Sequence, residues 1–219
     1  MAFRLCLLLK AKKMQTVSIQ LREKWLLALL PHIPFEGWTR QSLNRAADEA
    51  GLSAGEQALA APRGVPDLIR AFFDRAEAQA AREISAVELS EYRVHERVAL
   101  GVKIWLDALQ PHKEAARRAA QRGFLPWGSY AALERTYHVS DMIWTAIGDT
   151  STDYNQYTKR ALLASTVPLI FLHWLDQEDE EKLMAYIHKR LKIAMRFGQM
   201  GSKILSPALN RLKKNSADG

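Results

Sequence analysis

The stretch that decides the fold is TRQSLNRAADEAGLSAGEQALAA, residues 39–61. Its first half predicts a helix over 40–50, for which Thr39 supplies the side-chain oxygen of an N-cap. Gly51 then predicts the end of that helix, because glycine readily adopts the left-handed conformation that follows many helices. Ser53 has the same capping chemistry ahead of a second, short helix. The segment therefore predicts a helix-turn-helix.

The second helix of this motif lacks the cations with which such motifs bind DNA. Residues 53–61 contain one acid, Glu56, and no base, and across residues 39–61 two arginines are set against three acids. Without cations a protein neutralises few phosphates, so its affinity for DNA is low. We expect a degenerate motif that binds no nucleic acid. A repressor-type transcriptional regulator that binds DNA remains the alternative.

The rest of the chain also has helical periodicity, and we predict an all-α fold of about nine helices. Residues 161–175 are the most apolar stretch, but 15 residues fall short of the about 20 that a membrane-spanning helix needs. Pro168 lies inside this stretch, which predicts a buried, kinked core helix. The other helices are expected over 20–30, 66–83, 88–109, 129–147 and 181–197, with one more from Pro111 to Gly123.

Charge is concentrated at the two ends of this 219-residue chain, whose net charge is +7. Residues 1–13 contain four basic residues and no acid, and residues 182–219 contain nine basic residues against one acid. Basic ends attract anions such as lipid headgroups. We divide the chain into a flexible basic N-terminus (1–19), a degenerate helix-turn-helix subdomain (20–64), a helical lipid-binding and dimerisation domain (65–197) and an amphipathic basic C-terminal segment (198–219).

The C-terminal segment predicts a helix with an apolar face opposite lysines, a pattern typical of helices that lie on membranes. Pro207 must bend this helix or restart it, with Ser206 as its cap. The alternative, which stays open, is a last helix that packs back on the domain or on a second subunit. The predicted membrane-binding residues are Met200, Lys203, Ile204, Leu205, Leu209, Leu212, Lys213 and Lys214.

The sequence has no motif of a catalytic or metal site. Its six histidines are scattered, without an HExxH pair, and it has no GxSxG, P-loop or dinucleotide-binding glycine pattern. Cys6 is the single cysteine, which excludes a disulfide framework and a cysteine-based zinc site. We predict no catalytic residue, no metal and no cofactor.

Bulky apolar residues of the long helices have two interpretations. They form a plain core, which the pattern favours, or they leave an apolar cavity for a ligand. The residues that would line such a lipid pocket are Trp105, Leu109, Tyr137, Trp144, Leu163, Val167, Leu172 and Trp174.

Three stretches together carry a resemblance to a known family. Residues 25–38 read WLLALLPHIPFEGW and lead into RAADEAG at 45–51, residues 91–109 read EYRVHERVALGVKIWLDAL, and residues 148–162 read GDTSTDYNQYTKRAL. Over about residues 20–197 the chain resembles the ubiquinone-biosynthesis accessory protein family (coenzyme Q protein nine). The GDTSTD block is the most specific of these motifs.

This resemblance implies a fold similar to the tetracycline-repressor family, a homodimer and a hydrophobic pocket for isoprenoid or quinone lipids. It implies a C-terminal helix on an anionic membrane surface, and a protein that is not an enzyme but presents quinone intermediates to the demethoxyubiquinone hydroxylase. The location expected is cytoplasmic and peripheral on the inner membrane of a bacterium, because no Arg/Ser-rich mitochondrial presequence is evident.

The resemblance also implies a surface that docks the hydroxylase. The family usually has Trp where Gln156 stands, and tryptophan is a favoured interface anchor. The substitution at Gln156 therefore bears on the strength of docking and on the identity of the partner. The docking residues implied are Asp153, Tyr154, Asn155, Gln156 and Tyr157.

Overall fold

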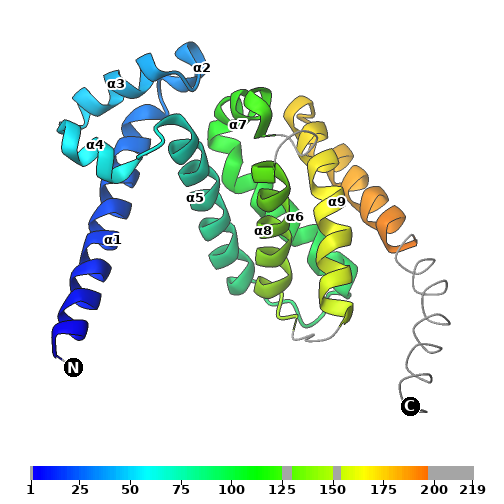
Figure 1. Ribbon diagram of the computed structural model, residues 1–219. Helices are drawn as coiled ribbons and strands as arrows, with labels where there is room; N and C mark the ends of the chain where they lie inside the picture. The colour runs from blue at the N-terminus through cyan, green and yellow to red at the C-terminus, as the bar shows by residue number, and fades with distance from the viewer. Residues whose placement is uncertain (1, 125–129, 150–153, 197–219) are drawn as a thin grey trace, which may run out of the picture. The chain divides into compact units, whose positions relative to one another are not determined.

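A computed structural model describes the backbone of residues 2–124, 130–149 and 154–196, and the side chains of 15–122, 132–149 and 156–196. Throughout these ranges the regular structure is helical, with no strand, which confirms the predicted all-α fold (Figure 1). The helices are α1 (Ala2–Leu29), α2 (Ile33–Glu36), α3 (Arg40–Glu49), α4 (Ala54–Ala60), α5 (Val65–Ala86), α6 (Val94–Leu109), α7 (Lys113–Ala119), α8 (Tyr130–Ala146) and α9 (Tyr154–Asp176), with short 3₁₀ and π turns at Gln110–His112 and Ala120–Phe124 and a further helix over residues 180–196.

The first helix is longer than the sequence pattern indicated. Residues 1–19 were expected to be a flexible N-terminus, whereas α1 begins at Ala2. No glycine or proline occurs between residues 2 and 19, so nothing there ends a helix. α1 ends before Pro31 as expected, but Pro34 does not mark the end of helical structure. It lies in the first turn of α2, where its missing N–H costs nothing.

Both predicted caps of the helix-turn-helix are present. The Thr39 hydroxyl accepts a hydrogen bond from the backbone N–H of Ser42 at 3.1 Å, and the Ser42 hydroxyl accepts one from Thr39 N–H. Ser53 and Glu56 make the same reciprocal pair at the start of α4. Gly51 has φ of 62°, a conformation that favours glycine. Local side-chain chemistry therefore sets both helix starts and the turn between them.

The chain divides into two compact units, and the first comprises residues 1–78 and 109–124. Two buried indoles hold it together through hydrogen bonds to main-chain carbonyls. Trp25 Nε1 donates to Leu43 O at 3.0 Å, and Trp38 Nε1 donates to Ala115 O at 2.9 Å. The second bond joins the N-terminal helices to α7, so this unit differs from the subdomain predicted over 20–64.

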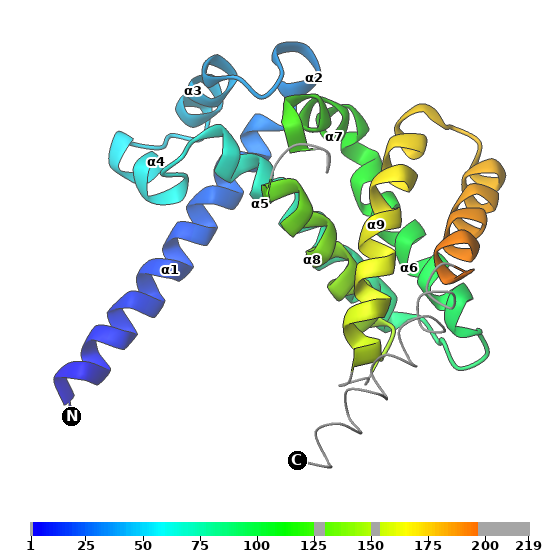
Figure 2. The same ribbon diagram turned by 45° about the vertical axis from the view of Figure 1, so that its right-hand side comes forward.

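The second unit comprises residues 79–108 and 125–219, described here over 79–108, 130–149 and 154–196. In it α8 and α9 pack along each other (Figure 2). Gly101 lets α6 approach α8, because a Cβ at this position would lie 2.8 Å from Ile143 Cγ2. α6 begins at Val94 rather than at residue 88. The Arg93 N–H donates a hydrogen bond to Glu96 Oε2 and so caps the start of this helix.

The apolar helix α9 runs from Tyr154 to Asp176 and so contains the whole apolar stretch of residues 161–175. The polar residues at its start are compatible with a helix, so the apolar stretch marks only the buried part. Pro168 lies inside the continuous helix and is buried, as its place in an apolar run predicted.

Candidate functional site

The second unit contains an apolar pocket of about 300 Å³. It is walled by α6, α8, α9 and the helix over 180–196, and most of its lining side chains are hydrocarbon. A pocket of this kind suits an apolar ligand, and its volume lies at the low end of the roughly 300–1,000 Å³ that ligand sites have. The lining residues are Val94, His95, Val98, Trp144, Lys159, Leu162, Leu163, Leu191, Ala194 and Met195.

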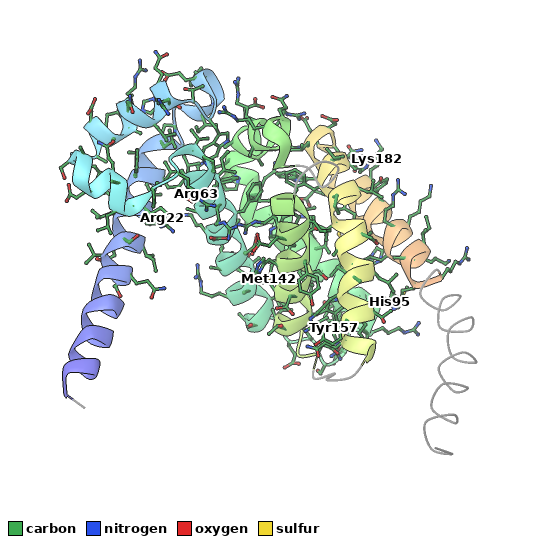
Figure 3. All side chains as sticks on the ribbon, in the orientation of Figure 1. Arg22, Arg63, His95, Met142, Tyr157 and Lys182 are labelled. Carbon is green, nitrogen blue, oxygen red and sulfur yellow. The ribbon has the colours of Figure 1, made fainter. Side chains whose placement is uncertain are left out.

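Lys159 brings a charge to this apolar wall. Its ammonium lies 2.9 Å from Asp149 Oδ1 and 5.2 Å from the centre of the Trp144 ring. The carboxylate neutralises the cation, and the ring face attracts it further. His95 is the other polar side chain of the lining (Figure 3 labels it), and its Nε2 lies 4.0 Å from a Glu96 oxygen. Ligand oxygens would meet these two side chains.

A buried arginine beside the pocket joins α8 to the start of α9. Arg160 is 3% exposed, and its guanidinium reaches Asp141 Oδ1 at 2.5 Å and Asp149 Oδ2 at 3.3 Å. Burial by itself lowers the pKa of Arg160, but the hydrogen bonds and charges of the two carboxylates raise it overall. The Ser140 hydroxyl donates to Arg160 O at 2.7 Å. This network fixes the position of Lys159 on the pocket wall.

Two indole N–H groups of the second unit are buried without a hydrogen-bond acceptor. They belong to Trp144, which is 8% exposed, and to Trp105, which is 3% exposed. An unsatisfied buried donor costs about 1–3 kcal/mol. The second unit therefore loses folding free energy at these two N–H groups, which a hydrogen-bond acceptor for each would restore.

The structure brings only part of the predicted lipid-pocket set to this pocket. Trp144 and Leu163 line it. The side chains that do not line it have other places: Trp105, Val167 and Trp174 are core residues, Leu109 is buried in the first unit, Tyr137 is 39% exposed and Leu172 is half-buried. The rings of Trp105 and Trp174 each pack at a tilt against Phe171, with 5.9 Å and 5.6 Å between ring centres. Trp105, Val167 and Trp174 therefore belong to a filled core, as the plain-core interpretation predicted.

Sequence reasoning missed eight of the pocket residues. They come from the first turns of α6, from α9 and from the end of the helix over 180–196: Val94, His95, Val98, Lys159, Leu162, Leu191, Ala194 and Met195. Their signal was weak, because small and medium apolar side chains at helical spacing are equally typical of a filled core.

The predicted docking residues lie at the start of α9. Tyr157 is 64% exposed, and Gln156 is half-buried, with its carbonyl 3.5 Å from Arg160 Nη1 (Figure 3 labels Tyr157). Tyr154 and Asn155 form the first turn, and their side chains lie outside the described residues, as does Asp153. The predicted membrane-binding residues also lie outside them: Met200, Lys203, Ile204, Leu205, Leu209, Leu212, Lys213 and Lys214.

Comparison with known proteins gives a family match that includes most of the pocket residues. The sequence model of the COQ9 family matches residues 130–198, a span that contains α8, α9 and seven of the ten pocket residues. The chain resembles the COQ9 family. Human ubiquinone biosynthesis protein COQ9, mitochondrial, is 27% identical over 197 residues, which cover 85% of this chain and 61% of the human protein. The Drosophila melanogaster COQ9 protein is 26% identical over 162 residues, or 72% of this chain and 49% of its own length.

A solved structure supports the fold. The TetR transcriptional regulator from Nitrosomonas europaea matches with a TM-score of 0.63 and 20% sequence identity, over 80% of this chain and 97% of the regulator. This likeness confirms the TetR-like fold that the resemblance to COQ9 implied.

Three further facts concern the length of the match, membrane crossing and metal ligands. The chain spans about 61% of the length of its mammalian relatives, whose names describe them as mitochondrial. Within residues 2–124, 130–149 and 154–196, no helix combines the length and the apolarity that a bilayer crossing requires. In the same part of the chain, no three His, Cys, Asp or Glu residues group as metal ligands would.

Proposed function

We propose that this chain takes part in ubiquinone biosynthesis as a non-catalytic protein that binds an isoprenoid or quinone lipid and presents it, at an anionic membrane surface, to the demethoxyubiquinone hydroxylase. The observation that carries the proposal is the apolar pocket of the second unit. The names of its COQ9 relatives, which describe ubiquinone biosynthesis proteins, support the choice of ligand.

A lipid with a long isoprenoid tail needs a protein to leave the bilayer. Each methylene that leaves the bilayer for water costs about 0.8 kcal/mol, so a long isoprenoid tail does not leave a membrane unaided. An apolar pocket removes that cost for the part of the ligand it encloses. At about 300 Å³ it encloses a ring with a short length of tail, and the rest extends past Val94 and Met195, which are 55% and 43% exposed.

Filling the pocket tests the proposal directly. Ala194 lines it, so Ala194→Trp places an indole in the space that the ligand would occupy. Ala185 is exposed on the same helix and does not line it, so Ala185→Trp is the matched control. Native mass spectrometry with lipid extraction should find an isoprenoid with the unsubstituted protein and with the control, and none with Ala194→Trp. Equal isoprenoid in all three, or none in any, contradicts the proposal.

Presentation to the hydroxylase is tested at Tyr157. Its large exposed side chain is the described member of the docking set with most surface to offer. Tyr157→Ala should weaken binding to the hydroxylase at least tenfold in a pull-down titration, whereas Gln156→Trp should strengthen it. Leu133→Ala, which removes an equally exposed side chain from α8, is the control. Unchanged binding in Tyr157→Ala would remove this surface from the proposal.

The likeness to a TetR regulator favours one competing function, repression through DNA binding. The short helix α4, however, presents Ala54, Gly55 and Leu59 to solvent and carries no cation. Mobility-shift assays with genomic fragments at low salt distinguish the two functions. We expect no shift; a sequence-specific shift would favour the regulator.

A further inference from the structure

The short helix α2 of the first unit exposes a phenylalanine. Phe35 is 85% exposed, more than any other large apolar side chain in the described part of the chain. Ile33 and Trp38, on either side of it in the sequence, are buried at 0% and 1% exposure. Leaving a side chain of this size in water forgoes about 1.5–3 kcal/mol of burial free energy. The first unit therefore holds Phe35 in solvent between two residues that anchor the segment inside.

Hydrogen bonds to α7 fix the backbone that carries Phe35. α2 lies against α7 (Figure 2). Before Phe35, the guanidinium of Arg118 donates to Pro34 O at 2.7 Å, and after it the indole of Trp38 donates to Ala115 O at 2.9 Å. An aromatic side chain on a fixed backbone has little conformational entropy to lose on binding. Phe35 is thus preorganised for an apolar contact.

The face of α7 that points away from the core is basic. The buried residues of α7 are alanines, and every α7 side chain that is not buried is charged. Over residues 14–181 the chain contains 18 basic and 23 acidic side chains, so a basic cluster is unusual there. A local excess of cations attracts an acidic surface. Residues 110–122 contain the acid Glu114 and four basic residues, Lys113, Arg117, Arg118 and Arg122.

This composition favours a protein partner over a membrane or a nucleic acid. A helix that lies on a membrane has an apolar face, which the solvent-facing side of α7 lacks. A site for the phosphate backbone needs cations above all, and here Arg118 already donates to Glu114 and to a main-chain carbonyl. Aromatic side chains together with arginines are enriched in protein interfaces. The acid-rich loop of this chain, residues 176–181, contains no apolar residue that could meet Phe35 in a second copy.

We propose that Phe35, Arg117, Arg118 and Arg122 form a docking site for another protein, which receives the Phe35 ring in an apolar pocket edged by Asp and Glu. The ring supplies the apolar contact, and the arginines steer and orient the partner. This site is built from the first unit, whereas the apolar pocket belongs to the second. Its test is therefore independent of the function proposed above.

A photo-crosslinker at position 35 tests the docking site in the full chain. Benzoylphenylalanine in place of Phe35 keeps an aromatic side chain there, and the same residue in place of Leu59, exposed on α4, is the control. After irradiation in an extract of the source cells, position 35 should attach to a protein that the control does not, within a stretch that peptide mass spectrometry finds rich in Asp and Glu. No protein specific to position 35, or a stretch without acids, overturns the proposal. Attachment to lipid, to nucleic acid or to another copy of this chain also overturns it.

Binding to that purified partner separates docking from proximity. Phe35→Ala should weaken binding about tenfold or more and leave thermal unfolding unchanged, whereas Leu59→Ala should leave binding unchanged. Arg122→Glu should weaken binding at about 0.05 M salt and much less at about 0.5 M salt, where charges are screened. Arg82→Glu makes the same change at an exposed position of the second unit and should have no effect. Equal effects of Phe35→Ala and Leu59→Ala, or of Arg122→Glu and Arg82→Glu, overturn the proposal.

Discussion

Four buried tryptophans show how differently the two units are packed. In the first unit the indoles of Trp25 and Trp38 each donate a hydrogen bond to a main-chain carbonyl, at 3.0 and 2.9 Å. In the second unit the indole N–H groups of Trp105 and Trp144 are buried with no acceptor, and Trp144 lines an unfilled pocket. The first unit pairs both of these indoles and the second pairs neither, although the first unit also has one buried side-chain oxygen without a hydrogen-bond partner, Glu36 Oε2.

This difference agrees with a candidate site in the second unit. Filling a pocket and pairing a buried donor are common routes to higher stability. Departures from good packing are expected at functional sites, where they are compensated elsewhere. The buried arginine network beside the pocket is such a compensation. Four predictions test the contrast between the units.

The largest effect is expected from breaking the arginine network of the second unit. Arg160→Ala leaves Asp149, a mostly buried carboxylate, without one of its cationic partners. Removal of one partner from a buried ion pair costs about 3–5 kcal/mol, because the remaining charge is uncompensated. Urea unfolding followed by circular dichroism measures the loss. Lys103→Ala, which breaks ion pairs to the exposed acids Asp107 and Glu180, should cost less than about 1 kcal/mol; equal losses would contradict the argument.

Replacing one tryptophan in each unit by phenylalanine compares a hydrogen-bonded indole with an indole that has no acceptor. Trp38→Phe removes a made hydrogen bond and part of a buried ring, so we expect the free energy of unfolding to fall by about 1–3 kcal/mol. Trp144→Phe removes an N–H that has no acceptor, which offsets the smaller ring, so its change should be less than about 1 kcal/mol. Similar losses in the two variants would mean that the Trp144 N–H is paired in solution.

Close packing of α6 on α8 in the second unit is tested at Gly101. Gly101→Ala places a methyl group 2.8 Å from Ile143 Cγ2, a branched and buried side chain. Overpacking lowers the free energy of unfolding by about 1–3 kcal/mol. The higher helix propensity of alanine raises it again by about 1 kcal/mol. In thermal unfolding, Ile143→Ala should destabilise the parent more than it destabilises Gly101→Ala. Strict additivity of the two changes would show that the helices do not meet at this point.

The smallest effect is a pH dependence of the first unit. Burial, and then the nearby positive charge of Arg75, lower the pKa of His112, whose ring meets Phe72 edge-on. The folded state therefore disfavours protonated His112. Its contribution is fully present above the ordinary histidine pKa of about 6.5 and is lost as the pH falls through the lower folded pKa. His112→Gln should flatten the dependence of the unfolding free energy on pH between pH 7 and 5, as measured by urea unfolding at a series of pH values; an unchanged dependence would contradict the argument.

Much of the fold is local chemistry and could be predicted from the sequence. Thr39 and Ser53 cap their helices, and Gly51 separates them, because each acts on its own backbone within a few residues. The all-α class follows from periodicity in the same way. The exceptions are informative: α1 runs on to Ala2 because nothing in residues 2–19 stops it, and Pro34 starts a short helix instead of ending one.

The pocket was decided by the tertiary structure. Trp105 and Trp144 have similar apolar neighbours in the sequence, yet Trp105 packs against Phe171 in the core and Trp144 lines the pocket. Helical spacing shows which face of a helix is buried, but not whether the opposing surface fills it. That depends on where α6, α8, α9 and the helix over 180–196 meet. It brings residues far apart in the chain, such as Val94 and Met195, to the lining of one pocket. The sequence by itself therefore determined the helices and their caps, while packing alone decided which apolar side chains line an unfilled pocket.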